Sequence, residues 1–155
     1  MEAASNAKGW RSGSSSLFWL ALLGTTLWRA AAAGRFDLSH DEGYYHYWSL
    51  FPSLSYYDHP PLTAWAMHLS GRLLGDTVWA VRGWPLLGGI ATALLARRLG
   101  RLAFGPEAGN RAGLLIALAP VFLGNGLFMT PDALLVPAWA RSEERRVGKE
   151  CRSRW

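Results

Sequence analysis

Acidic, histidine and aromatic side chains gather in one stretch, residues 40–61, which reads HDEGYYHYWSLFPSLSYYDHPP. A carboxylate in such a cluster can take a proton from a hydroxyl group as a general base. Asp41 and Glu42, at the start of an expected short helix, are the candidates for that role. An acid at this position can also simply cap the helix, and for an isolated acid that is the simpler explanation.

Further polar and aromatic side chains could line a site beside these two acids. Asp58 and His59 precede a double proline, where an Asx turn is the simpler explanation. Arg82, at the mouth of an expected membrane span, can extend to the interface or bind a phosphate. The tyrosines and tryptophans are typical of a membrane-interface belt, and they could equally stack on a sugar ring.

A metal is the other chemistry that residues 40–46 admit. The spacing there is His-x-Glu-x3-His, which differs from the zinc-protease pattern His-Glu-x-x-His. The single cysteine, Cys151, provides neither a disulfide framework nor a cysteine metal site. The sequence therefore implies no cofactor with certainty, and a divalent metal stays an open alternative.

The composition indicates a membrane protein. Hydrophobic residues make up 50% of the chain and charged residues 17%, against roughly 25% charged in soluble proteins. The formal net charge is +5, but much of the excess lies in the last fifteen residues. Residues 1–140 contain no basic stripe with interleaved aromatic side chains, so no nucleic-acid partner is expected.

The elements that must position the polar stretch are expected to be helices, which gives an all-α fold. Residues 1–16 are predicted to be a disordered cytoplasmic N-terminus. Membrane spans are expected at about residues 17–33, 77–97 and 112–128, and a truncated fourth helix is expected from residue 132. A cleaved signal peptide is the competing interpretation of the first span, and it would leave a secreted soluble protein.

Two amphipathic interfacial helices are expected in the first outer loop. One begins at Glu42 and ends at Phe51-Pro52. The other covers residues 62–74, with an apolar face at helical spacing. That face consists of Leu62, Trp65, Ala66 and Leu69. Helices of this kind beside a span can lie in the membrane surface.

The basic residues predict the orientation. Six of them fall on the side of residues 1–16 and the 97–111 connection, and four fall on the other side. This excess places residues 1–16 in the cytoplasm. The 40–61 stretch and Asp132 are then expected to face the opposite compartment together.

The tail, residues 141–155, changes character abruptly. Its sequence, RSEERRVGKECRSRW, has no apolar periodicity. It looks like the translation of a common sequencing adapter, so it is interpreted as an artefact and left out of the fold prediction.

Four pieces of sequence, in order, carry a family resemblance: DEGYYHYWS, LSYYDHPPLTAW, WAVRGWP and MTPDALL. The sequence resembles the dolichyl-phosphate-mannose protein mannosyltransferase and lipid A aminoarabinose transferase group, the family-39 glycosyltransferases of the GT-C fold. The resemblance covers roughly residues 17–140 and implies the N-terminal part of a polytopic GT-C transmembrane domain. It implies an enzyme that transfers a sugar from a polyprenyl-phosphate donor to an acceptor hydroxyl, on the outer face and with inversion.

The resemblance also implies the site. Asp41 would be the catalytic base, with Glu42 supporting it. The residues placed at the substrate are Tyr45, Tyr57, Asp58, His59, Arg82 and Asp132. Arg82 would meet the departing lipid phosphate, and Asp132 would be a second acid of the site.

The implied partners are a polyprenyl-phosphate-linked sugar donor, a lipid, glycan or protein acceptor, and membrane lipid. The expected location is the plasma membrane, the inner membrane in a bacterium, with the site on the periplasmic or outer face. Such enzymes have many more spans, so the chain is expected to be an N-terminal fragment that is inactive alone. The alternative is a small non-enzymatic membrane protein or a transporter fragment.

Overall fold

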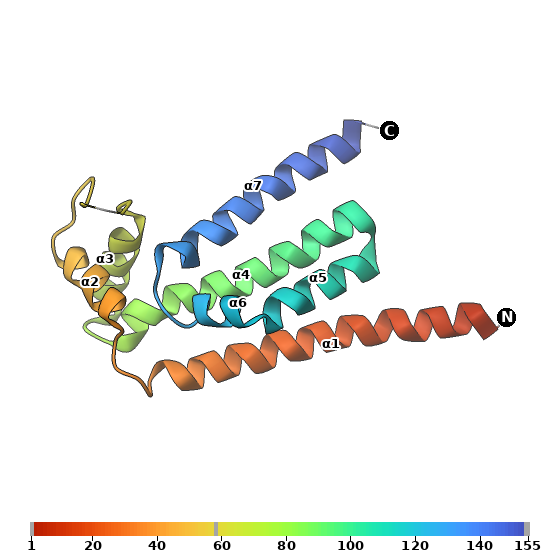
Figure 1. Ribbon diagram of the computed structural model, residues 1–155, viewed down its shortest axis with the longest axis horizontal. Coiled ribbons are helices and arrows are strands. Elements are labelled where there is room, and N and C mark those ends of the chain that lie inside the picture. The colour runs from red at the N-terminus through yellow and green to blue at the C-terminus, as the bar shows by residue number, and fades with distance from the viewer. Residues whose placement is uncertain (1, 58, 154–155) are drawn as a thin grey trace.

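The computed structural model describes residues 2–57 and 59–153, and within them the chain forms helices and no strands. The helices are α1 (Glu2–Ala33), α2 (His40–Leu50), α3 (Leu62–Leu74), α4 (Val78–Phe104), α5 (Pro106–Leu118), α6 (Pro120–Asn125) and α7 (Pro131–Ser153). Helix α4 packs against both α5 and α7, and α1 packs against α5 and α4. The two short helices α2 and α3 lie together at one end of these long helices (Figure 1). The expected all-α architecture is confirmed.

Two helices of the described chain are long and apolar enough to cross a membrane. They cover Gly13–Ala33 within α1 and Val78–Phe104, which is α4. The end of α1 and the start of α4 lie at the same end of the molecule as α2 and α3 (Figure 1). A segment built of α2 and α3 therefore joins the two candidate spans.

Helix α1 begins at Glu2, whereas disorder is expected through residue 16. Extending a helix costs less than starting one, so α1 can continue into a segment of low helix propensity. Contacts with α4 and α5 also hold that segment, because Arg97 donates to Ser15 Oγ at 3.3 Å and Asn110 donates to Ser14 Oγ at 3.2 Å.

The region expected to form one span at 112–128 is broken into α5 and α6. Ala119, between them, is extended, with φ −66° and ψ 129°. The ring of Pro120 disfavours a helical conformation at the preceding residue, and proline has no N–H to continue the helix. This break keeps α5 at thirteen residues, which is too short to cross a bilayer alone.

Helix α7 continues through residues 141–153 of the tail, beyond the short fourth helix expected from the sequence. Glu144 stabilises this extension, because its carboxylate pairs with Arg141 on the same helix and with Arg98 on α4. The pairing explains the helical conformation and leaves the adapter interpretation of these residues as a prediction.

The second interfacial helix is confirmed at its predicted bounds, Leu62–Leu74. Of its predicted apolar face, Ala66 is buried, whereas the three larger side chains, Leu62, Trp65 and Leu69, are exposed. The buried face of α3 instead carries Ala64, Ala66 and Met67. These pack with Tyr45 and Trp48 of α2 in one apolar cluster, which also contains Val81 and Met129.

Candidate functional site

The first turn of α2 is held by a capping box. Ser39 is the N-cap, and its hydroxyl accepts from the Glu42 N–H at 3.3 Å. The Glu42 carboxylate accepts in return from the Ser39 N–H at 2.9 Å. This reciprocal pairing satisfies backbone donors that a helix start otherwise leaves free. The N-cap is therefore Ser39, and Asp41 lies inside the first turn.

Glu42 and Arg82 form a buried ion pair at the centre of this end of the molecule. Glu42 is 0% exposed and Arg82 is 1% exposed. The guanidinium donates Nε to Oε1 at 3.0 Å and Nη2 to Oε2 at 2.8 Å, so the two groups meet in a bidentate fork. Such geometry gives the strongest charge-assisted hydrogen bonds.

Backbone groups complete the hydrogen bonding of Arg82. Its Nη1 donates to the carbonyl oxygens of Ala33 and Phe36, and its Nη2 donates to the carbonyl oxygen of Asp37. With the two bonds to Glu42, these contacts use the five N–H groups that a guanidinium has. Arg82 therefore ties the end of α1 and the α1–α2 connection to α4, and it has no free donor for a phosphate in this arrangement.

The Glu42 carboxylate is equally saturated, since Oε1 also accepts from the Met129 N–H at 3.1 Å. Burial alone raises the pKa of Glu42, but the hydrogen bonds from Arg82, Ser39 and Met129, together with the Arg82 charge, outweigh it and lower the pKa overall. Glu42 is thus an ionised carboxylate at neutral pH, with all its acceptor positions in use.

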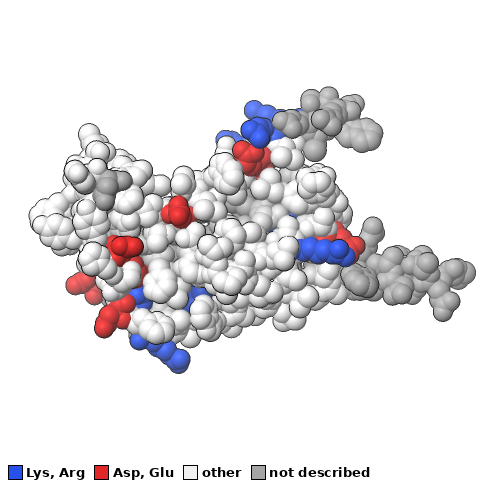
Figure 2. Space-filling model, viewed as in Figure 1, with Lys and Arg blue, Asp and Glu red and all other residues white. Residues whose placement is uncertain are grey.

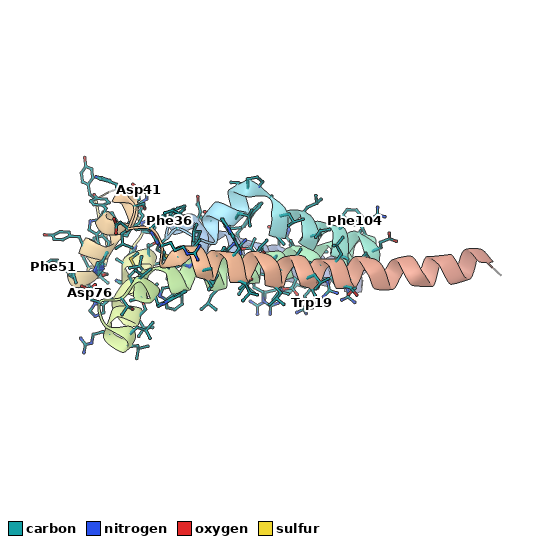
Figure 3. All side chains as sticks on the ribbon, turned by 90° about the horizontal axis from the view of Figure 1, so that it is seen from below. Trp19, Phe36, Asp41, Phe51, Asp76 and Phe104 are labelled. Carbon is teal, nitrogen blue, oxygen red and sulfur yellow. The ribbon has the colours of Figure 1, made fainter. Side chains whose placement is uncertain are left out.

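Asp41 lies next to Glu42 but faces outward. Its side chain is 73% exposed, and its contact is with His40, at 3.8 Å. Figure 3 shows Asp41 at one end of the molecule, and Phe104 lies at the other end of α4. The partial positive charge of a helix N-terminus favours an anion here. Of the two adjacent acids, Asp41 is the one that a substrate can reach.

The segment before α7 reaches this site across the molecule. The bond between Met129 and Glu42 joins residues 87 positions apart, and the Phe128 ring lies 5.6 Å below the Arg82 guanidinium. Asp132, in the first turn of α7, is exposed just beyond that contact. The structure therefore brings the two acidic segments to the same end of the molecule, and Figure 2 shows acidic side chains on the surface there.

Four further residues are expected at the substrate: Tyr45, Tyr57, Asp58 and His59. Tyr45 is 5% exposed, and its ring centroid lies 5.5 Å from that of His59. Tyr57 is 99% exposed. Asp58 lies outside the described residues. The assignment of these four residues to a substrate stays a prediction.

Within the described residues, no three His, Cys, Asp or Glu side chains lie together as metal ligands. The group considered from the sequence does not converge, because the His40 side chain is 99% exposed while Glu42 is buried against Arg82. This arrangement does not fit the His-x-Glu-x3-His interpretation.

Two features of this site were not predicted from the sequence. The pattern Ser39-x-x-Glu42 is the sequence signal of a capping box, and it would have assigned Ser39 as the cap. The stacking of Trp48 on Tyr56, with ring centroids 4.6 Å apart, orders the loop after α2. The Tyr56 hydroxyl also donates to the Trp48 carbonyl oxygen at 3.1 Å. No sequence signal predicts these contacts between Trp48 and Tyr56.

Taken together, these features define an all-helical membrane protein in which the segment between the two candidate spans carries a fixed acidic turn. A family model described as dolichyl-phosphate-mannose-protein mannosyltransferase matches residues 58–142. This is more than half of the chain, and the chain belongs to that family. The resemblance stated from the sequence is confirmed. The matched region contains His59, Arg82 and Asp132 and begins after Asp41.

Among curated proteins, lipid A galacturonosyltransferase RgtD of Rhizobium johnstonii is 30% identical over 122 residues. The alignment covers 76% of this chain and 25% of that protein. The chain thus spans about a quarter of the length of this relative. No solved structure matches the chain.

Proposed function

We propose that the chain is the N-terminal part of a membrane glycosyltransferase that moves a sugar from a polyprenyl-phosphate donor to an acceptor hydroxyl. Family membership supports the class of reaction, and the printed name of the relative supports a sugar transfer. The observation that carries a residue-level assignment is the exposed Asp41 carboxylate on a turn fixed by the Glu42–Arg82 pair.

The proposed chemistry is a single displacement with inversion. The acceptor oxygen forms a bond to the anomeric carbon while the bond from that carbon to the phosphate oxygen breaks. The phosphate leaves with the electron pair, and the hydroxyl proton passes to Asp41 as general base. Capping does not account for Asp41, because Ser39 provides the cap.

Glu42 and Arg82 are assigned to positioning in this proposal. Each is enclosed and hydrogen-bonded to the other, so neither offers a free group to a substrate. Their fork fixes the turn on which Asp41 lies, and a catalytic group held on a rigid element loses less entropy at the transition state. Asp132 is proposed as a second acid facing the same compartment.

The test replaces Asp41 with Asn in the full-length protein that contains this segment. Loss of the base is expected to lower kcat by about 10²–10⁴-fold, measured as sugar transfer from the lipid donor in membranes. Asp37→Asn is the matched control, because that exposed side chain lies in the same loop and Arg82 contacts only its backbone oxygen. Unchanged transfer with Asp41→Asn would contradict the assignment.

A further inference from the structure

Buried polar atoms without a partner occur at one place in α1. Among the side chains that the structure describes, the buried nitrogen and oxygen atoms lacking any hydrogen-bond partner are Thr26 Oγ1, Arg29 Nε and Arg29 Nη1. Residues three apart lie on the same face of a helix, so these three donors share a face of α1. Most buried polar groups in proteins are paired, and a cluster of unpaired ones needs an explanation.

The charge of Arg29 makes the cluster more unusual. Arg29 is 2% exposed, and a guanidinium stays protonated in proteins. Its one hydrogen bond is a long one, from Nη2 to the neutral carbonyl oxygen of Phe122 at 3.3 Å. An ionised side chain within a membrane span is costly unless it is paired.

No acid of the described chain neutralises Arg29. The ion pairs found there do not include it. The Glu42 carboxylate is already occupied by Arg82, Ser39 and Met129. The counter-charge must therefore come from a group outside the described residues.

Glycines leave room for the Arg29 guanidinium. A Cβ at Gly126 would lie 2.8 Å from its Cζ, and a Cβ at Gly89 would lie 2.7 Å from its Nη1. The cover over the group includes α6, which carries the Phe122 carbonyl oxygen and has no buried residue. Pro120 and Val121 of α6 are exposed, and its other four residues are half-buried. The Phe122 carbonyl oxygen is neutral, so an anion at this face would bind the guanidinium more strongly than that carbonyl does.

The depth of Arg29 indicates which anion this is. Arg29 is four residues before the end of the span at Ala33, or about 6 Å along the helix axis. Arg29 is in the last part of α1, and the C-terminal end of α1 lies at the end of the molecule that carries α2 (Figure 1). A lipid phosphate lies at the membrane interface, which an arginine this close to the end of a span can reach.

We propose that Thr26 and Arg29 bind the phosphate group of a polyprenyl-phosphate lipid. The two arginine nitrogens and the threonine hydroxyl would donate to phosphate oxygens, and the phosphate charge would neutralise Arg29. The choice of lipid rests on the proposed function. This assigns the phosphate contact to Arg29, whose donors are free, in place of Arg82, whose donors are used.

The test measures binding to the full-length protein that contains this segment, in nanodiscs of a neutral lipid, with radiolabelled undecaprenyl phosphate as the probe. Arg29→Gln removes the charge, and the Kd is expected to rise about tenfold or more. Thr26→Val removes one neutral hydrogen bond, and the Kd is expected to rise about threefold. Arg35→Gln, an exposed arginine just beyond the same span, is the matched control and should change the Kd by less than about twofold.

Undecaprenol, which lacks the phosphate, is expected to compete poorly, and so is inorganic phosphate. Equal competition by undecaprenol would overturn the phosphate contact, and equal competition by inorganic phosphate would overturn the lipid assignment. Unchanged binding by Arg29→Gln, or equal losses with Arg29→Gln and Arg35→Gln, would also overturn the proposal. Helical content by circular dichroism checks folding, and if Arg29→Gln unfolds, the Thr26→Val result decides. Binding needs no sugar transfer, so this test and the Asp41→Asn test fail independently.

Discussion

Adjacent acids at the start of α2 have opposite environments. The Asp41 side chain is 73% exposed, whereas Glu42 is 0% exposed. Consecutive residues on a helix point about 100° apart, so one can face solvent while the next faces the core. The sequence predicts that both acids belong to the functional site. The family resemblance gives them different roles, but the residue types alone do not, because the difference in burial depends on Arg82, which lies 40 residues further along the chain.

Replacing Glu42 with Gln tests the buried pair. The change leaves the Arg82 charge enclosed without a counter-charge, and we expect the free energy of unfolding to fall by about 3–5 kcal/mol. The measurement is equilibrium unfolding in detergent micelles. Glu107→Gln removes the exposed pair with Arg111 and should cost no more than about 1 kcal/mol. Equal losses from the two substitutions would show that the Glu42 pair has no special weight.

The pH dependence of stability offers a second test of the same pair. The folded-state pKa of Glu42 is lowered from the ordinary value of 4.5. The pair therefore contributes its full stabilisation above that ordinary value and loses it as the pH falls through the lower folded-state pKa. As the pH falls through this range, the wild-type protein should lose stability more steeply than Glu42→Gln. The measurement is the thermal unfolding temperature of both proteins at several pH values. An equal loss of stability with falling pH in the two proteins would contradict this prediction.

Local sequence sets a helix boundary where a proline interrupts the helix or a side chain caps its first turn. Pro120 splits the expected third span, and Ser39 with Glu42 starts α2. Both signals are local features of the sequence: a proline inside an apolar run, and a serine three residues before a glutamate. The packing of α7 against α4 is different, since it depends on a backbone approach between Gly88 and Ala133 that no local pattern encodes.

Gly88→Ala tests that approach. A Cβ at Gly88 would collide with the Ala133 carbonyl oxygen, and backbone atoms cannot yield cheaply, so we expect α7 to shift and stability to fall by about 1–3 kcal/mol. Gly83→Ala on the same helix meets nothing within 4 Å and should be neutral or stabilising by up to about 1 kcal/mol. The measurement is the free energy of unfolding of the two variants in detergent micelles. Similar gains at both positions would show that the α4–α7 contact is looser than described.

At the scale of the whole molecule, hydropathy predicts three spans and a truncated fourth helix, and the basic residues predict an orientation. Within the described residues, two helices are long and apolar enough to cross a membrane. Asp41 lies at one end of the molecule, and Phe104, the last residue of α4, lies far from it along the long axis (Figure 3). The hydrogen bond from Met129 to Glu42, which closes the site, joins parts of the chain too far apart for any periodicity to reveal.

Cysteine labelling tests the proposed orientation. With Cys151 replaced by Ser, a cysteine at Ser55 should react with a membrane-impermeant maleimide in intact bacterial spheroplasts. A cysteine at Ala103, which is exposed at the far end of α4, should react only after permeabilisation. The reverse pattern would place the acidic turn in the cytoplasm and would remove the proposed active face.

The bonds around Glu42 have a consequence for the order of synthesis. A ribosome delivers Ser39 and Glu42 first, Arg82 some forty residues later and Met129 last. Until α4 emerges, the Glu42 carboxylate has no cation beside it, and the hydration it would lose on burial is unreplaced. The turn that carries Glu42 is therefore expected to stay hydrated until Arg82 has been synthesised. Arg82 then ties this turn to α4, and the Met129 N–H, synthesised last, completes the hydrogen bonds of the carboxylate.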